Sequence, residues 1–198
     1  PISIEVFMSK LYCNGRTLNE KVLQGVNVLA DNVVSTLGPK GRNVILYDGN
    51  KPIVTKDGVT IANFIDLQDP FENLGAQVIK QASQQTAAQA GDGTTTATVL
   101  ARSIMNEAQK YIIAGASPTD LKRGMDSAVE YLVRKIEENS KPISSLENIE
   151  HVATISANGD KKIGKLIAMA VDKVGKDGAI TIEAGVIANP TANTLAIG

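Results

Sequence analysis

The sequence predicts a mainly α-helical domain that carries one small β-hairpin and is followed by part of a small α/β domain. Apolar residues recur with a helical period over most of the chain. The period becomes strand-like around residues 43–55, and the pattern resets near Ser140. The length of 198 residues fits one domain and a piece of another, since domains average roughly 150 residues.

The first expected helix covers Thr17–Leu37, where apolar residues recur every three or four positions and form a broad stripe. Thr17 and Glu20 have the spacing of a T-x-x-E capping box, which would start this helix. Gly38-Pro39 would end it. This segment therefore predicts one long, half-buried helix that runs into a glycine-bearing loop.

A β-hairpin and further helices follow. Residues 43–47 and 52–55 predict its two strands, and the Asp, Gly and Asn at 48–50 predict its turn. Helical periods return in five later segments, which are Glu72–Ala90, Thr96–Ala114, Pro118–Asn139, Ser145–Ile155 and Asp160–Val174. A short strand is expected at 179–183.

The composition becomes more polar at 140–142, and we expect a domain boundary there. Residues 1–140 would form the first domain, and residues 141–185 a segment of the second. Residues 186–198 show no sustained period and are expected to be a tail.

Charge and composition exclude several classes of function. The 20 basic and 21 acidic side chains give a net charge of −1, so no field of one sign favours nucleic acid or an anionic membrane. One Cys and one His cannot by themselves form a disulfide or a Cys/His zinc site, and a reducing compartment fits best. Apolar runs stay far below the roughly 20 residues of a membrane span, and no secretory signal is visible. We expect a soluble, cytoplasmic protein with no nucleic acid or membrane partner.

The most informative stretch is Ala90–Thr98, which joins two expected helices. Two glycines flank Asp92 and let the backbone approach a ligand, and hydroxyls follow at the start of the next helix, where unpaired N–H groups attract anions. Asp92 would coordinate Mg²⁺, which prefers one or two carboxylates together with phosphate oxygens. The pattern is not GxxxxGK[ST], so it does not imply a P-loop fold. By itself it is also the pattern of an ordinary capped loop.

Two further segments have matching chemistry. Thr36–Asn43 is a second glycine-bearing loop with two cations, although Gly-Pro after a helix is also an ordinary stop signal. Thr55–Thr60 lies where a strand gives way to a helix. Lys56 would neutralise phosphate charge there, and Asp57 would orient a water or contact the metal shell, although Asp-Gly is also common in plain turns.

Six motifs in this order resemble the group I chaperonins, the GroEL-like family. They are Thr36–Asn43, Thr55–Gly58, Glu72–Gln77, Ala90–Thr98, Asp120–Gly124 and Thr154–Asn158. The resemblance runs from about Met8 to about Gly185, and residues 1–7 and 186–198 do not match. The sequences at Asn73–Gln77 and Thr154–Asn158 favour the bacterial and organellar branch.

The resemblance implies an ATP-driven protein-folding machine of stacked seven-membered rings, in which each subunit has an equatorial, an intermediate and an apical domain. Residues 1–140 would belong to the equatorial domain and 141–185 to the first intermediate segment. Unfolded clients and a co-chaperonin lid would bind through the apical domain, which these residues do not include.

The resemblance also assigns roles to single residues. Asp92 would bind Mg²⁺, and Asp57 would assist the attacking water, with Lys56 beside it at the γ-phosphate and potassium side. The nucleotide and its phosphates would be held by Thr36, Leu37, Gly38, Pro39, Gly93, Thr94, Thr95 and Thr96. Ile155 and Ser156 would touch the nucleotide from the intermediate domain.

Family members run to well over twice this length, and the missing part supplies the acid that polarises the attacking water and the residues that hold ribose and adenine. These 198 residues alone are therefore expected not to turn over ATP. An alternative is a non-hydrolysing assembly fragment with weak or no nucleotide binding. An unrelated kinase or ATPase would need its own base and adenine pocket, and neither is apparent in the sequence.

Overall fold

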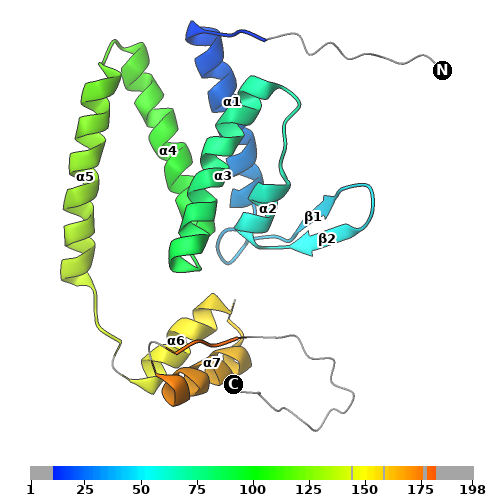
Figure 1. Cartoon of the computed structure of the whole chain (residues 1–198), viewed down its shortest axis with the longest axis vertical. Coiled ribbons are helices and arrows are strands. Elements are labelled where there is room, and N and C mark those ends of the chain that lie inside the picture. The colour runs from blue at the N-terminus through cyan, green and yellow to red at the C-terminus, as the bar shows by residue number, and fades with distance from the viewer. Residues whose placement is uncertain (1–10, 144, 158, 176–177, 182–198) are drawn as a thin grey trace. The chain divides into compact units, whose positions relative to one another are not determined.

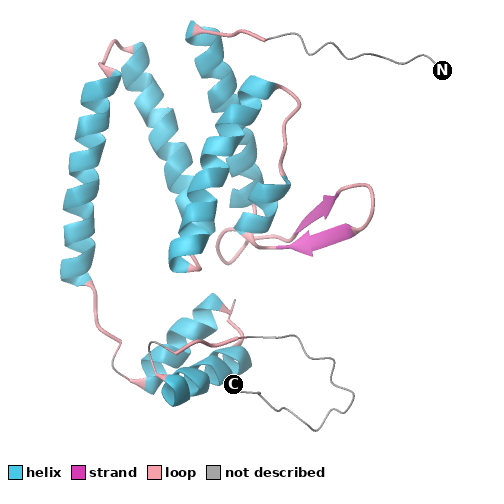
Figure 2. Cartoon of the chain, viewed as in Figure 1, coloured by secondary structure: helices cyan, strands magenta, loops and turns pink. Residues whose placement is uncertain are grey.

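The computed structural model describes residues 11–143, 145–157, 159–175 and 178–181. In these ranges the chain forms seven α-helices and one two-stranded antiparallel sheet (Figures 1 and 2), which confirms the mainly helical fold with a small hairpin. The elements are α1 Gly15–Val34, β1 Val44–Tyr47, β2 Pro52–Thr55, α2 Gly58–Phe64, α3 Pro70–Ala90, α4 Thr94–Ile113, α5 Pro118–Asn139, α6 Leu146–Ser156 and α7 Lys161–Val174. None of the helices in the described ranges combines the length and the apolar content needed to cross a bilayer.

The chain divides into two compact units, Pro1–Ala128 and Val129–Gly198, which are described separately. The division falls inside α5, whereas the boundary predicted at 140–142 follows that helix. The assignment of 1–140 and 141–185 to two family domains stays a prediction.

The core of the first unit lies between α1, α2, α3 and the hairpin. Its buried side chains are Val26, Leu29, Val33, Leu46, Ile61, Ala62, Ala76 and Ile79, and Ala101 and Met105 of α4 pack against them. Helices α1 and α3 approach so closely that a Cβ on Gly25 would lie 1.7 Å from the carbonyl oxygen of Glu72. On the other helix, a Cβ on Gly75 would lie 1.9 Å from the carbonyl oxygen of Val22. Only glycine fits at this crossing, because both obstacles are backbone atoms.

The bounds of α1 differ from the prediction at both ends. The helix begins at Gly15 after Asn14, so the predicted capping box of Thr17 and Glu20 is wrong, and Glu20 instead pairs with Arg16 at 2.7 Å. The helix ends at Val34 and not at Leu37, because the backbone then tightens into a turn: the Leu37 N–H donates to the Val34 carbonyl at 2.9 Å. This short-range bond places Leu37 in the following loop.

Cap residues explain the shifted starts of three other helices. Asp69 caps α3, its Oδ1 accepting the N–H groups of Phe71 (2.9 Å) and Glu72 (3.2 Å), so this helix begins at Pro70 and not at Glu72. Ser145 and Asp160, predicted as helical, are the N-caps of α6 and α7. An N-cap residue has a non-helical backbone, which is why each helix begins one residue later.

The Asp69 carboxylate also holds Lys21 of α1. Oδ2 of Asp69 accepts a hydrogen bond from Lys21 Nζ, which lies 5.6 Å from the centre of the Phe71 ring. This hydrogen bond raises the pKa of Lys21 above its ordinary value and lowers the pKa of Asp69, while partial burial opposes both shifts. The start of α3 is therefore tied to the N-terminal half of α1.

The hairpin is confirmed, with its first strand beginning at Val44. Val44 pairs with Thr55 and Tyr47 with Pro52. At the turn, the Asn50 N–H donates to Asp48 Oδ1 at 2.9 Å. Of the β1 side chains only Leu46 is buried, so the hairpin is attached to the core through this strand.

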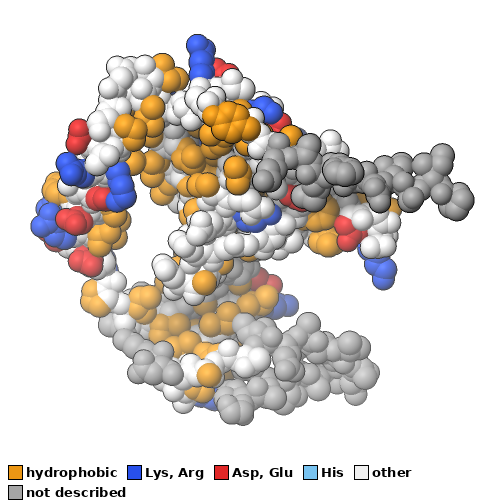
Figure 3. Space-filling view, turned by 45° about the horizontal axis from the view of Figure 1, so that its top comes forward, with side chains coloured by type: hydrophobic (Ala, Val, Ile, Leu, Met, Phe, Trp, Pro, Cys, Tyr) orange, Lys and Arg blue, Asp and Glu red, His pale blue; other side chains and the backbone are white. Residues whose placement is uncertain are grey.

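Helix α5 has no buried residue, and its bounds are those predicted. Acidic and basic side chains are mixed along it (Figure 3), and ion pairs join Lys122 to Asp126 at 2.6 Å and Lys135 to Glu138 at 2.6 Å. Exposed pairs one turn apart contribute only a few tenths of a kcal/mol each.

In the second unit, α6 packs on α7. A Cβ on Gly164 would lie 2.0 Å from Thr154 Oγ1, and the buried side chains around this contact are those of Ala153, Ala168 and Ala170. The strand predicted at 179–183 is not formed over 179–181, which have no regular secondary structure. Its last two residues and the predicted tail at 186–198 lie outside the described residues.

Candidate functional site

Asp92 lies between two glycines that both have a left-handed backbone. Gly91 ends α3 with φ 71°, and Gly93 precedes α4 with φ 80°. Residues with side chains avoid this conformation, so glycine is needed on both sides of the acid. The Gly93 N–H donates to Asp92 Oδ1 at 2.6 Å, and Asp92 is exposed. The carboxylate is thereby held at the surface of a sharp turn.

Helix α4 begins at Thr94, two residues earlier than predicted, so Thr94, Thr95 and Thr96 form its first turn. No side chain caps this start, because the N-cap residue is Gly93. The first N–H groups of a helix lack partners within the helix, and they attract anions. Thr98 is buried, and its hydroxyl donates to the Thr94 carbonyl at 2.9 Å. The last hydroxyl of the motif is therefore buried and bonded within the helix, and it is not available to a ligand.

The loop after α1 folds back on itself. The Arg42 N–H donates to the Ser35 carbonyl at 2.9 Å and closes the loop at its base. Within it Gly38 has φ +75°, and a Cβ on Gly41 would lie 2.0 Å from the Thr36 carbonyl oxygen. The two glycines are required for different reasons, one for its backbone conformation and the other for close packing.

The loop contains four predicted nucleotide-binding residues, which are Thr36, Leu37, Gly38 and Pro39. The Thr36 hydroxyl donates to the Val33 carbonyl at 2.7 Å and thus helps to end α1. The Leu37 side chain is 47% exposed, and Gly38 and Pro39 are exposed. The three exposed residues form an accessible surface beside the helix end.

Asp57 is the N-cap of the short helix α2. Its Oδ2 accepts the Thr60 N–H at 2.8 Å and the Thr60 hydroxyl at 2.6 Å. The Asp57 N–H donates to Thr55 Oγ1 at 3.0 Å. Lys56 and Asp57 are both exposed. Thr60 thus fixes one carboxylate oxygen and leaves Oδ1 for other contacts.

Gly58 brings the three segments together. A Cβ on Gly58 would lie 2.6 Å from Thr95 Oγ1, 3.3 Å from Thr94 Oγ1 and 3.2 Å from Val33 Cγ1. The start of α2, the start of α4 and the end of α1 therefore meet at this residue. Asp57 immediately precedes it, and the loop after α1 begins just beyond Val33. The hydroxyls of Thr94 and Thr95 and the first N–H groups of α4 thus lie close to the residue after Asp57, and Asp92 precedes Thr94 by two residues. This is the chemistry that a metal-bound phosphate requires.

Residues 29–190 match the TCP-1/cpn60 chaperonin family, which is most of the chain. The chain belongs to this chaperonin family. Among solved structures it is similar to a group III chaperonin in the open state, with 28% identity and a TM-score of 0.68 over 81% of this chain and 32% of that one. It is also similar to the chaperonin gp146 from the bacteriophage EL 2 (Pseudomonas aeruginosa), determined in the presence of ATP-BeFx, with 27% identity and a TM-score of 0.64 over 78% of this chain and 27% of that one. The chain spans about a third or less of the length of these chaperonins.

Two predicted nucleotide contacts of this chaperonin chain lie in its second unit. Ile155 and Ser156 are the last residues of α6, and both are exposed, Ile155 to 73%. Their placement beside a nucleotide stays a prediction, because they lie in the second compact unit. Asn158, the last residue of their motif, lies outside the described residues.

One chaperonin motif has a packing role. Within Glu72–Gln77, the Glu72 carbonyl faces Gly25, Gly75 faces Val22, and Ala76 is buried in the core. This motif therefore builds the crossing of α1 and α3, away from the region around Gly58.

The chaperonin chain supplies few metal ligands of its own. Over the described ranges, no three His, Cys, Asp or Glu side chains gather where they would hold a metal. The exposed Asp92 carboxylate beside uncapped helix N–H groups fits Mg²⁺ that arrives with phosphate, since Mg²⁺ keeps several waters and needs only one or two carboxylates.

Sequence analysis placed Gly58 and Thr60 in a candidate segment and missed the roles of both in shaping this chaperonin site. Thr60 anchors Asp57, and the D-x-x-T spacing, typical of a helix N-cap, was a local signal for it. The packing of Gly58 against Thr95 had no local signal, because the two residues lie far apart in the sequence.

Proposed function

We propose that this chain is the nucleotide-binding part of an ATP-driven protein-folding chaperonin subunit of the group I type. The observation that carries the proposal is the contact of Gly58 with the hydroxyls of Thr94 and Thr95 and with Val33, which joins three segments of suitable chemistry. Membership of the TCP-1/cpn60 family supports the same function. The group I type rests on the sequences at Asn73–Gln77 and Thr154–Asn158.

The phosphates would lie at the start of α4. The uncapped N–H groups and the hydroxyls of the first turn would donate to phosphate oxygens, and Asp92 would hold Mg²⁺. When bound, Mg²⁺ neutralises phosphate charge and orients the reacting group. The exposed loop after α1 would line the nucleotide, and Lys56 would contribute a cation at the γ-phosphate and K⁺ side.

Asp57 would act on the attacking water. Thr60 engages its Oδ2 through two hydrogen bonds, so the carboxylate has a defined orientation and Oδ1 would accept a proton or orient the water. The role of Asp57 would therefore lie in hydrolysis more than in binding.

The remaining functions would belong to the whole chaperonin. By family resemblance, such subunits would assemble into seven-membered rings in the cytoplasm and would bind unfolded clients and a co-chaperonin lid. Because this chain spans 32% and 27% of the two solved chaperonins, the surfaces for clients and lid would lie outside it.

The alternative is a chaperonin assembly fragment that does not hydrolyse ATP. The chain's short span of its relatives favours this reading for the 198 residues taken alone. Calorimetric titration with Mg-ATP, together with the mass of the chain in solution, would separate the two. Binding without turnover supports the proposed nucleotide site, and no binding supports the assembly fragment.

The decisive test is the Asp92→Ala variant in the assembled chaperonin. Loss of the proposed metal ligand should lower Mg²⁺-dependent hydrolysis by orders of magnitude, because charge neutralisation by the metal is central to phosphoryl transfer. Circular dichroism should show an unchanged helix content. Near-normal turnover by this variant would refute the assignment of Asp92.

A further inference from the structure

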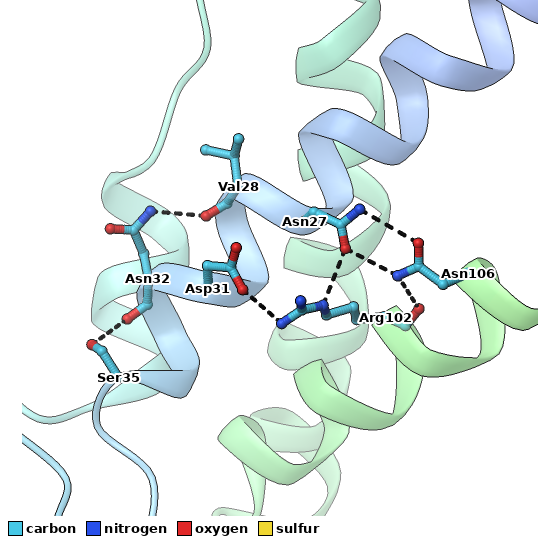
Figure 4. A network of polar contacts seen from close by, with 7 residues as sticks. All are labelled: Asn27, Val28, Asp31, Asn32, Ser35, Arg102 and Asn106. Carbon is cyan, nitrogen blue, oxygen red and sulfur yellow. Dashed lines mark hydrogen bonds and ion pairs between the residues drawn. The ribbon is translucent and has the colours of Figure 1, made fainter.

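A polar network joins α1 to α4 (Figure 4). Arg102 of α4 donates from Nε to Asn27 Oδ1 at 3.1 Å, and its guanidinium pairs with Asp31 Oδ1 at 2.7 Å. Asn106, one turn further along α4, donates to the same Asn27 oxygen at 3.0 Å and to the Arg102 carbonyl at 3.0 Å. Asn27 Nδ2 in turn donates to Asn106 Oδ1 at 3.4 Å. The contacts of Arg102 and Asn106 with Asn27, and of Arg102 with Asp31, connect the two helices, whereas the bond from Asn106 to the Arg102 carbonyl lies within α4.

The network restrains two motions at once. Asn27 and Asp31 lie one turn apart on the same face of α1, and one guanidinium contacts both. A planar group with several fixed N–H donors cannot satisfy both partners if α4 slides along α1 or rotates about its own axis. Arg102 therefore fixes the axial register of the two helices as well as their separation.

The same two helices both lead into the proposed nucleotide site. Asp31 lies three residues before the end of α1, about 5 Å at 1.5 Å per residue, and the loop of Thr36–Pro39 follows that end. Arg102 lies eight residues after Thr94, about 12 Å along α4. Near the site itself, the contact at Gly58 involves a methyl group and two hydroxyls, which set a minimum distance but hold nothing in register.

The ion pair in this network contributes little to the stability of the fold. The side chains of Arg102 and Asp31 are 32% and 65% exposed, and ion pairs with this exposure contribute little to stability. Catalysis is far more sensitive to position, because a displacement of about 1 Å can cost about 100-fold in rate.

We propose that Arg102 is a positioning residue that sets the register between the phosphate-binding start of α4 and the loop that follows α1. This inference rests on the proposed function, since it concerns the geometry of the same site. Arg102 touches no part of the proposed nucleotide region and would act only through α1 and α4.

The test compares two variants of the assembled chaperonin, each of which removes an ion pair between α1 and another part of the first unit. Arg102→Gln removes the guanidinium contacts between α4 and α1 and leaves the hydrogen bonds between Asn27 and Asn106. Lys21→Gln removes the ion pair between α1 and the residue that caps α3. Both variants remove one partly exposed ion pair from α1, so similar small changes in melting temperature are expected. Only Arg102→Gln should lower the kcat of ATP hydrolysis, by about 10-fold or more.

Two milder variants keep the test decisive if Arg102→Gln folds poorly. Asp31→Asn removes the ion pair and leaves the bond to Asn27, and Arg102→Lys keeps the charge and loses the fork, so both should lie between the parent and Arg102→Gln. The inference is overturned if the Arg102 variants keep kcat within about twofold of the parent, or if Lys21→Gln loses as much. Failure of the parent chaperonin to bind Mg-ATP would instead overturn the proposed function.

Discussion

Gly58 lies so close to the Thr95 hydroxyl that a Cβ at this position would require the Thr95 side chain to shift. A Cβ added to Gly58 would lie 2.6 Å from Thr95 Oγ1 and 3.2 Å from Val33 Cγ1. Gly58 is buried and is the first residue of α2, directly after the N-cap Asp57. A larger residue here would change the distance between the proposed catalytic carboxylate and the hydroxyls of α4.

Gly58→Ala should therefore weaken Mg-ATP binding by about 10-fold, since it displaces one wall of the site. It should also lower the free energy of unfolding by about 1–3 kcal/mol, the range for overpacked positions. Calorimetry and urea unfolding would measure the two effects.

Gly124→Ala is the matched control, because no atom lies within 4 Å of its added Cβ. That change in an open helix position should stabilise by about 0.5–1 kcal/mol. Unchanged binding in Gly58→Ala would mean that the nucleotide does not use this corner.

Asp57→Asn separates the capping role of Asp57 from its proposed role in hydrolysis. Asparagine caps a helix about as well as aspartate, so the Thr60 N–H keeps an acceptor and the melting temperature should hardly change. The amide cannot take a proton, so hydrolysis should fall by about 100-fold or more while ATP affinity changes far less. Single-turnover kinetics beside equilibrium binding would test this. Equal losses in both would show that Asp57 has been misplaced.

The crossing of α1 and α3 should tolerate no side chain. Gly25→Ala puts a Cβ 1.7 Å from the Glu72 carbonyl oxygen, and a backbone atom cannot rotate away. The helices would have to separate along the core, at a cost of about 3 kcal/mol, the upper end of the overpacking range. Chemical unfolding followed by circular dichroism would measure the loss. A cost as small as that of an exposed substitution would contradict the packing described for this crossing.

The pair of Lys21 and Asp69 predicts how stability depends on pH. The folded-state pKa of Asp69 is lowered, so its contribution is present above the ordinary value of 3.8 and is lost as the pH falls through the folded value. The folded-state pKa of Lys21 is raised, so its contribution is present below 10.5 and is lost as the pH rises through the folded value. The stability difference between the parent and Lys21→Gln should thus be constant at neutral pH. It should shrink in acid and in strong alkali. Unfolding midpoints across the pH range would test this, and a difference that persists undiminished in acid would exclude the pair as its source.

Much of the fold could be predicted because its signals are local. The helical period of α5 marks both of its ends, Pro118 and Asn139, and the Asp-Gly-Asn turn marks the hairpin. The start of α1 was predicted wrongly because a capping-box spacing also occurs inside the helix. Thr17 and Glu20 match a capping box, yet the helix continues back to Gly15, so the box lies inside it.

The candidate site was predictable in its parts and not in its assembly. The glycines around Asp92 are a local requirement of the turn, and their left-handed backbone agrees with that reading. The meeting of Gly58 with Thr95 and the tie from Arg102 to Asn27 depend on how helices pack, which a single sequence does not specify.

The closed loop after α1 has a consequence for proteolysis. Lys40 and Arg42 are exposed and would each offer trypsin a cleavage point, but the bond from Arg42 to the Ser35 carbonyl and the packing of Gly41 on Thr36 hold the intervening backbone in a bent form. A protease needs an extended strand, so nicking would wait for the loop to open. The rate at which trypsin cuts between α1 and β1 would then report how often this loop opens.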